Sequence, residues 1–100
     1  MVSVNIATRN DALRSRIPCV EKPDVLAITA GVNALGPEAV ANILLQVRDF
    51  RDFNEDNDPW QEHDFGSFSY AGNRVFWKID DYDGTDGFGL VLTVMLAEEY

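Results

Sequence analysis

The chain contains only one cysteine and one histidine among its 100 residues. A lone cysteine rules out an internal disulfide bond, and Cys19 with His63 cannot supply the several Cys and His ligands that a zinc site normally needs. His63 is also the only histidine base available to a Cys19 nucleophile, and it lies in an unrelated sequence context. We therefore expect no cysteine chemistry, no bound metal and no cofactor.

Long hydrophobic segments are also missing. No stretch approaches the roughly 20 consecutive apolar residues of a membrane helix, and residues 1–11 lack the basic start and apolar run of a signal peptide. We therefore expect a cytoplasmic protein that does not contact membranes. With 46% apolar residues, the chain is long enough for one packed core but not for two, so residues 1–100 are interpreted as a single domain.

Basic residues are scarce in the second half of the chain. Residues 1–48 hold five bases and four acids, whereas residues 49–100 hold three bases and thirteen acids and carry the whole net charge excess of -9. Such a charge repels nucleic acids and anionic membranes and attracts basic surfaces. Direct binding to DNA or RNA is thus disfavoured, and a macromolecular partner is expected to be basic.

Recognisable catalytic and ligand-binding motifs are absent as well. The chain has no GxxxxGK[ST] loop, no GxSxG elbow and no GxGxxG turn. Its aspartate runs do not fit a calcium loop, because a loop that begins at Asp81 places Asp86 where glycine is required. Phe76 also stands where a nuclease motif ending at Lys78 would need an acid. The interpretation is a protein without enzymatic activity.

Two amphipathic helices and a short strand are predicted for the first half of the chain. A helix over residues 3–15 has Ser3 as its N-cap and an apolar face that includes Ile6 and Leu13. Residues 25–30 form an apolar run typical of a strand buried on both faces. A second helix begins at Pro37 and carries the apolar stripe Val40, Ile43, Leu44, Val47 and Phe50.

The second half predicts a loop followed by three strands. Residues 53–62 have the composition of a loop, and residues 65–70 and 74–80 flank Ala71-Gly72-Asn73 as a hairpin whose second strand is central. Residues 83–87 indicate a second turn, and residues 88–97 the last strand. The predicted fold class is α+β, with a mostly antiparallel sheet of about four strands and two helices packed on one face.

Four segments resemble the proteobacterial domain-of-unknown-function family numbered 3768. They are LAITAGVNALGPE (26–38), DNDPWQEHDFG (56–66), VFWKIDDYD (75–83) and VLTVMLAEEY (91–100), in that order. Gln61 stands where the family pattern implies a glycine, and the segment after Asp83 is shorter than the family pattern implies. The resemblance implies no activity, cofactor or residue role.

The tripeptide Glu62-His63-Asp64 allows two interpretations. Together with Asp80 it could centre a small carboxylate-based, metal-dependent enzyme. The alternative is structural, with His63 fastening the loop to the hairpin through hydrogen bonds, and we favour this alternative because a single histidine is a weak metal signal. A third possibility for the chain is an accessory interaction module of unknown partner.

The acid distribution remains the main functional signal. About ten carboxylates fall on one loop and one turn beside the same hairpin, and solubility alone could account for them. The sharper hypothesis is an inhibitor that mimics the charge of DNA and blocks a basic, nucleic-acid-binding surface of a partner, by analogy with small acidic anti-restriction and anti-CRISPR proteins. The predicted partner-binding residues are Asp52, Glu55, Asp56, Asp58, Trp60, Glu62, Asp64, Asp80, Asp81, Asp83 and Asp86. The sequence does not predict an oligomeric state.

Overall fold

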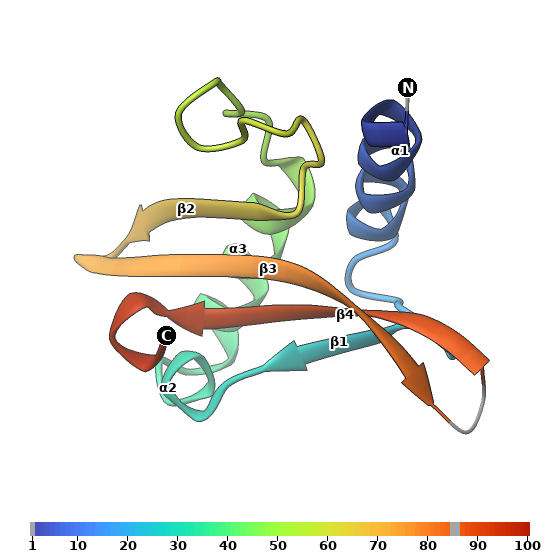
Figure 1. Ribbon diagram of the computed structural model, residues 1–100. Helices are drawn as coiled ribbons and strands as arrows, with labels where there is room; N and C mark the ends of the chain where they lie inside the picture. The colour runs from blue at the N-terminus through green and yellow to red at the C-terminus, as the bar shows by residue number, and fades with distance from the viewer. Residues whose placement is uncertain (1, 85–86) are drawn as a thin grey trace.

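A four-stranded sheet with helices on one face forms the molecule (Figure 1). The computed structural model describes residues 2–84 and 87–100. In chain order the elements are α1 (Val2–Ser15), β1 (Val25–Ile28), α2 (Ala30–Asn33), α3 (Pro37–Asp49), β2 (Phe65–Tyr70), β3 (Asn73–Gly84), β4 (Gly87–Leu96) and the 3-10 helix η1 (Ala97–Glu99). The strands lie in the order β1-β4-β3-β2, with only the β1–β4 pair parallel. This arrangement confirms the predicted α+β class and the mostly antiparallel sheet.

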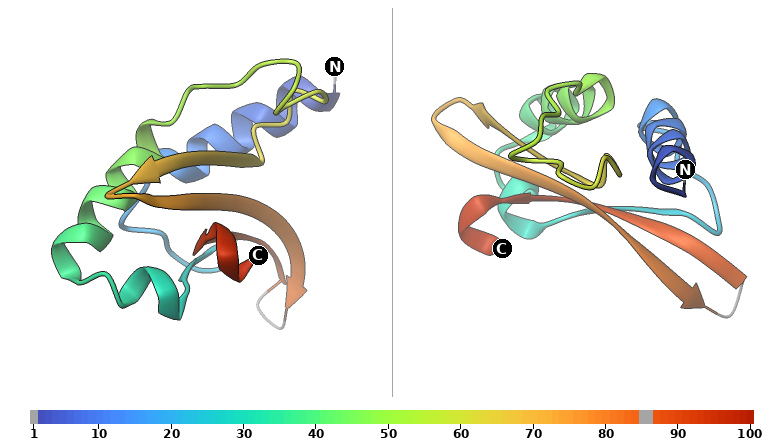
Figure 2. Two further views of the ribbon diagram at one scale, coloured as in Figure 1. Left: turned by 90° about the vertical axis from the view of Figure 1, so that its left-hand side faces the viewer. Right: turned by 45° about the horizontal axis from the view of Figure 1, so that its top comes forward.

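The core lies between the sheet and the two longer helices. Both helices cover the same side of the sheet (Figure 2). From the sheet, Trp77 and Leu92 are fully buried, and they meet Leu13 from α1 and Ile43 and Val47 from α3. Each buried aliphatic side chain contributes roughly 1.5–3 kcal/mol to the free energy of unfolding. The prediction of two helices on one face of the sheet is therefore confirmed.

The helix α3 forms as its sequence predicts. Pro37 occupies its first turn, where the missing N–H costs nothing, and Glu38 places a negative charge near the positive end of the helix dipole. Ile43, Leu44 and Val47 of the predicted stripe are buried. The other predicted helix is α1, which begins at Val2. Ser3 therefore lies inside its first turn, and the prediction that Ser3 is the N-cap is wrong.

The strand β1 differs from its prediction. It ends at Ile28, Ala30 already belongs to α2, and none of its four residues is fully buried. The reason is its place in the sheet, since β1 lies at the edge and pairs only with β4. An apolar run gives no information on how many neighbours a strand has. The prediction of a strand buried on both faces is therefore wrong.

The β3–β4 pair extends further than predicted. The ladder continues through Asp81↔Leu90 and Asp83↔Phe88 to Gly84↔Gly87, so Asp80, Asp81 and Asp83 lie on a strand. The predicted turn over residues 83–87 is thus too long, and residues 85 and 86 lie outside the described residues. Because side chains on a strand alternate between its faces, Asp81 and Asp83 point to the helix side of the sheet and Asp80 to the other side.

The 3-10 helix η1 ties the end of β4 to the start of α2. The Glu99 carboxylate accepts hydrogen bonds from Thr29 Oγ1 at 2.6 Å, from the Gly31 N–H at 2.8 Å and from the Leu96 N–H at 2.9 Å. The bond from Thr29 is the main cause that lowers the pKa of Glu99. The hydrogen bonds of Glu99 therefore join η1 to the start of α2 across the β1–β4 pair.

Replacing Gly66 with alanine should destabilise the fold. Gly66 is paired with Trp77 across the β2–β3 ladder, and a Cβ atom at position 66 would overlap the indole ring of Trp77. We expect Gly66→Ala to lower the free energy of unfolding by about 1–3 kcal/mol, because the buried indole must move. Denaturant unfolding measures this, and Ser69→Ala on the same strand should stay within about 0.5 kcal/mol of the parent chain. An unchanged midpoint for Gly66→Ala would contradict the packing described here.

Candidate acidic binding surface

The acid-rich loop between α3 and β2 is fastened to α1. Asn10 on α1 is 1% exposed, and its Nδ2 atom donates a hydrogen bond to the Glu62 backbone oxygen at 2.9 Å. Asp11 is the next residue of the helix, and its carboxylate lies within hydrogen-bond distance of the His63 imidazole. Two consecutive helix residues thus fix the end of the loop just before β2 begins.

Arg14 fixes the beginning of the same loop. Its guanidinium is buried, and Nη1 donates to the backbone oxygens of Val47 and Phe50, each at 2.9 Å. These carbonyls belong to the last turn of α3 and to the residue that follows it, where a helix leaves its acceptors unpaired. Nη2 donates to Asp11 at 2.8 Å, and the guanidinium carbon lies 4.9 Å from the centre of the Trp77 ring. Burial lowers the pKa of Arg14, which the bond to Asp11 partly offsets.

His63 is a structural residue of this network. Its ring stacks on Phe53 with the centroids 3.9 Å apart and the planes at 4°. Nδ1 lies 2.9 Å from Asp11 Oδ1, and Nε2 lies 3.5 Å from Asp58 Oδ2. The expected role as a fastener is therefore correct, but the bonded partner at Nδ1 is on α1, so the prediction that His63 fastens the loop to the hairpin is wrong.

Asp58 is not an exposed loop carboxylate. It is 7% exposed, and its Oδ1 atom accepts hydrogen bonds from the backbone N–H groups of Glu62 at 3.0 Å and His63 at 3.2 Å. These bonds hold a tight turn in which Gln61 and His63 have φ values of 55° and 53°. A glycine would adopt such a conformation without strain. Asp58 shapes the loop, and the expectation that it offers a free charge to a partner is wrong.

Four of the predicted partner-binding residues line one cavity. Glu62 and Asp64 at the end of the loop and Asp80 and Asp81 on β3 line a cavity of about 260 Å³, together with Arg9 and Asn10 of α1. The loop and the strand come together because Asp64 directly precedes β2, and its backbone oxygen accepts a bond from the Ile79 N–H at 2.9 Å. We call Glu62, Asp64, Asp80 and Asp81 the acidic cluster.

Charge within the acidic cluster is only partly compensated. Asp80 lies 3.2 Å from Lys78 Nζ, and Asp81 lies 3.2 Å from Arg9 Nη1. No ion pair between Glu62 or Asp64 and another of the described residues is found. Burial raises the pKa of Asp64, and the negative charges of Asp58 and Asp80 raise it further. Asp64 thus experiences like-charge repulsion from Asp58 and Asp80.

The remaining predicted residues surround the cluster at greater distance. Asp52, Glu55 and Asp56 are exposed on the loop, where their charges face solvent. Trp60 on the same loop is 75% exposed. Asp83 is exposed near the end of β3, and Asp86 lies outside the described residues. The structure therefore unites part of the predicted site and leaves the rest spread over the loop and the β3–β4 arm.

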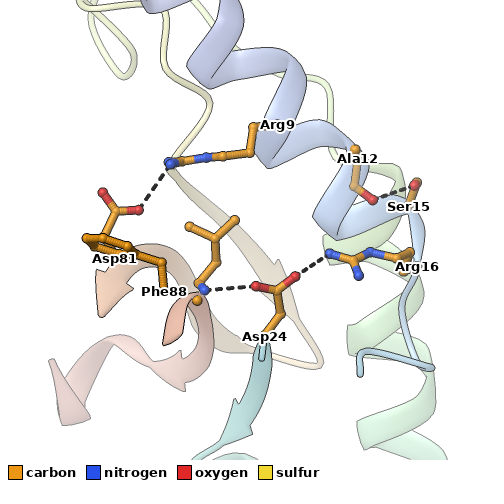
Figure 3. A pocket seen from close by; sticks show the side chains of 9 residues that line it. Arg9, Ala12, Ser15, Arg16, Asp24, Asp81 and Phe88 are labelled. Atoms are coloured by element: carbon orange, nitrogen blue, oxygen red, sulfur yellow. Dashed lines mark hydrogen bonds and ion pairs between the residues drawn. The ribbon is translucent and has the colours of Figure 1, made fainter. Parts of the chain in front are cut away.

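A second cavity lies beside the cluster and was not predicted from the sequence. It measures about 700 Å³ and lies between α1 and the start of β4, where Figure 3 shows Arg9 of α1 and Arg16, just after the end of α1, reaching toward Asp81 and Asp24. The Arg16–Asp24 pair is 2.6 Å long, and Asp24 also accepts a bond from the Leu90 N–H at 2.9 Å. Arg9 lies on α1, whereas Arg16 follows its last residue, so the helical period alone does not predict that the two side chains line one cavity.

The hypothesis of a metal-dependent enzyme receives no support from the geometry. Within residues 2–84 and 87–100, no group of three or more His, Cys, Asp and Glu side chains is arranged to hold a metal ion. His63 points to Asp11 and Phe53, whereas Glu62, Asp64 and Asp80 line the cavity of the acidic cluster. Cys19 is exposed and far along the chain from these residues.

Comparison with known proteins decides the family. Residues 28–99 match the family model described as protein of unknown function (DUF3768). The chain belongs to the DUF3768 family. The match covers α2, α3 and the strands β2 to β4, so it contains the whole acidic cluster, whereas α1 precedes it. No curated protein and no solved structure matches this DUF3768 chain. None of its described helices is both long and apolar enough to cross a membrane.

Removing the guanidinium of Arg14 should destabilise the protein strongly. Arg14→Met keeps much of the side-chain length but removes the charge-assisted hydrogen bonds to the carbonyls of Val47 and Phe50, and it leaves Val47 with only the longer bond from the Phe50 N–H at 3.4 Å. We expect the free energy of unfolding to fall by about 3–5 kcal/mol, as for other broken buried charge networks. Arg48→Met is the matched control, because Arg48 contacts only its neighbour Asp49 through its ion pair, and it should change stability by about 0.5 kcal/mol or less. Equal effects in urea unfolding would rule out the role given to Arg14.

Neutralising Asp64 should stabilise the protein in a pH-dependent way. Its pKa is raised above 3.8 in the folded state, so the charged carboxylate costs stability above the folded pKa, and this cost disappears as the pH falls through that value. Asp64→Asn should therefore melt at a higher temperature than the parent chain at pH 7, and the difference should vanish in acid. Melting curves over this pH range test it, with Asp52→Asn as the equal-charge control. A constant difference, or a destabilised variant at pH 7, would count against the repulsion.

Proposed function

We propose that this chain is a cytoplasmic, non-enzymatic acidic binding protein that occupies the basic, nucleic-acid-binding surface of a partner protein and thereby inhibits it. The observation that carries the proposal is the acidic cluster, where acidic residues from a loop and from a strand line one cavity, and of these only Asp80 and Asp81 form ion pairs within the described residues. Closely spaced negative charges on a protein reproduce the electrostatic character of a nucleic-acid backbone.

The energetics of the acidic cluster favour a cationic partner. Burial is the main cause that raises the pKa of Asp64, and the negative charges of Asp58 and Asp80 add to it, so the charged carboxylate lowers the stability of the free protein. Lysine or arginine side chains of a partner would turn this repulsion into attraction and increase the rate of association. Perturbed carboxylates in a concave site are also typical of functional sites.

The loop supplies further features of a protein interface. Trp60 is largely exposed, and tryptophan is enriched among the residues that dominate binding energies. Asp52, Glu55 and Asp56 extend the negative charge along the loop beyond the acidic cluster. Because Asn10, Asp11 and Asp58 hold this loop in place, little ordering entropy is lost when a partner binds.

The partner is proposed to be a nucleic-acid-binding complex of the host cell. A proteobacterial host, which the family resemblance implies, would make restriction and CRISPR complexes candidates, so that the protein would act against host defence. This part of the proposal is an analogy with other small acidic inhibitors.

The proposed function predicts that binding depends on where the charges are. The test variant carries Asp56→Asn, Glu62→Gln and Asp64→Asn. The control variant carries Glu21→Gln, Glu38→Gln and Glu98→Gln, which removes equal charge from the α1–β1 segment, the first turn of α3 and η1. Proteins captured from a nuclease-treated proteobacterial extract would be identified at low and at high salt. DNA should displace the captured partner, and the test variant should bind it at least about tenfold more weakly than the control variant.

Two results would refute the proposal. One is a partner that binds the test and control variants equally, which would show that total charge and not the acidic cluster governs binding. The other is a set of captured partners none of which binds nucleic acid. Circular dichroism of both variants confirms that neither has lost its fold, since substitutions at exposed and half-exposed loop sites usually change stability little.

A further inference from the structure

Another cavity, beside the end of α3, is basic. It measures about 360 Å³, and three of the eight basic residues of the chain line it: Arg14, Arg48 and Arg51. It shares no lining residue with the cavity of the acidic cluster. Basic side chains are thus gathered at one place in a chain whose net charge is -9. What this cavity binds is independent of the proposed partner protein.

The three arginines come from three parts of the fold. Arg14 lies on α1, Arg48 lies in the last turn of α3, and Arg51 follows two residues after that helix ends. Asp49 lies among them, since the hydrogen bond from Arg48 is the main cause that lowers its pKa and the charges of Arg51 and Arg14 lower it as well. Because the interaction between charges weakens with distance, all three guanidinium groups lie near the Asp49 carboxylate.

The carboxylates that line the cavity do not balance its cations. Arg14 Nη2 bonds to Asp11 at 2.8 Å, and Arg48 bonds to Asp49 through two nitrogens, at 2.9 and 3.2 Å. Within residues 2–84 and 87–100, no ion pair and no side-chain hydrogen bond of Arg51 is found. Three guanidinium groups and two carboxylates leave one positive charge in excess, and the N–H groups of the Arg51 guanidinium are available to a ligand.

The C-terminal end of α3 does not oppose an anion at this place. The last carbonyls of a helix carry partial negative charge and normally attract cations. Arg14 Nη1 already donates to the backbone oxygens of Val47, Arg48 and Phe50, so these acceptors are paired with a cation. Arg14 Nε is buried and has no hydrogen-bond partner among the described residues. A buried, unpaired donor on a residue that lines a cavity favours a ligand with acceptor oxygens.

We propose that this cavity binds the phosphate group of a small molecule, with Arg48 and Arg51 as its exposed donors and Arg14 as the buried cation beside them. A planar guanidinium presents two parallel N–H groups to two oxygens of one oxyanion. The oxygens of a phosphate point in several directions, so guanidinium groups from different elements can each bind it, whereas a carboxylate offers two oxygens in one plane. The cavity volume is near the lower limit of small-molecule sites, about 300–1,000 Å³, which limits the ligand to a small phosphate.

Asp49 competes with the phosphate for the same donors. Its side chain is 60% exposed and occupies two nitrogens of Arg48, so a phosphate must displace this carboxylate or share Arg48 with it. Asp49 therefore weakens binding, whereas Arg51 strengthens it. Variants of these two residues should change the affinity in opposite directions, and each needs a control with the same change in net charge.

Titration followed by NMR tests the site, with inorganic phosphate, glycerol phosphate and acetate as probes at constant ionic strength. Either phosphate should shift the backbone amide signals of Ser15, Arg48 and Arg51 in a saturable way. Acetate should bind at least about tenfold more weakly, because it carries one charge and forms fewer charge-assisted hydrogen bonds. Tighter binding of glycerol phosphate would identify the ligand as a phosphate ester, and equal binding would identify it as the free ion, and both results agree with the proposal.

Four variants show whether the cavity or the net charge governs binding. Arg51→Gln should raise the Kd of phosphate at least about fivefold, and Asp49→Asn should lower it at least about threefold, because one removes a donor and the other a competing anion. Arg74→Gln and Asp56→Asn make the same charge changes at residues that do not line the cavity. These controls should change the Kd by less than about twofold, since salt screens distant charges.

Three results would overturn the proposal. The first is the lack of any saturable shift with either phosphate at millimolar concentration. The second is equal binding of acetate and phosphate, which would show that the cavity does not distinguish a phosphate from a carboxylate. The third is an equal Kd for each test variant and its control, which would show that net charge alone attracts the anion. The melting temperature of each variant confirms that its fold is intact.

Discussion

One buried guanidinium holds α1, α3, the acidic loop and the sheet in register with one another. Arg14 donates to the last carbonyls of α3, where a helix concentrates unpaired acceptors and negative potential. Its far edge bonds to Asp11, which in turn holds His63, so the beginning and the end of the loop depend on the same network. The faces of Trp77 and Phe53 lie within 5.4 Å of the guanidinium and offset part of the cost of its burial.

This arrangement separates the carboxylates into two classes. Asp11 and Asp58 accept bonds within the protein and determine the loop conformation, whereas Glu62 and Asp64 line an open cavity without a cation of their own. The hydrogen bonds of Asp11 and Asp58 keep Glu62 and Asp64 close to each other, because charge repulsion would otherwise move the parts of a flexible acidic loop apart. A binding surface made of closely spaced charges requires such a rigid support.

Local patterns in the sequence predict the helix α3 and the β2–β3 hairpin well, because apolar periodicity and turn residues act over a few positions. The extension of β3 through Asp80 and Asp83 could not be predicted in this way, since aspartate is unfavourable in strands and only pairing with β4 keeps it there. Composition likewise cannot distinguish the buried Asp58 from the exposed Asp56. The role of Arg14 was missed for the same reason, because its carbonyl partners are more than 30 residues away along the chain.

The parallel pairing of β1 with β4 has a consequence for the order of folding. Its partners Val25 and Val91 are 66 positions apart, whereas β2, β3 and β4 follow one another with short connections. Closing the longer loop costs more chain entropy, so the three-stranded meander is expected to form before β1 docks. Until then β4 is itself an edge strand, and its backbone groups that later bond to β1 are unpaired. A nascent chain therefore passes through a stage in which both borders of its sheet are open to other strands, and slow docking of β1 would increase misassembly between chains.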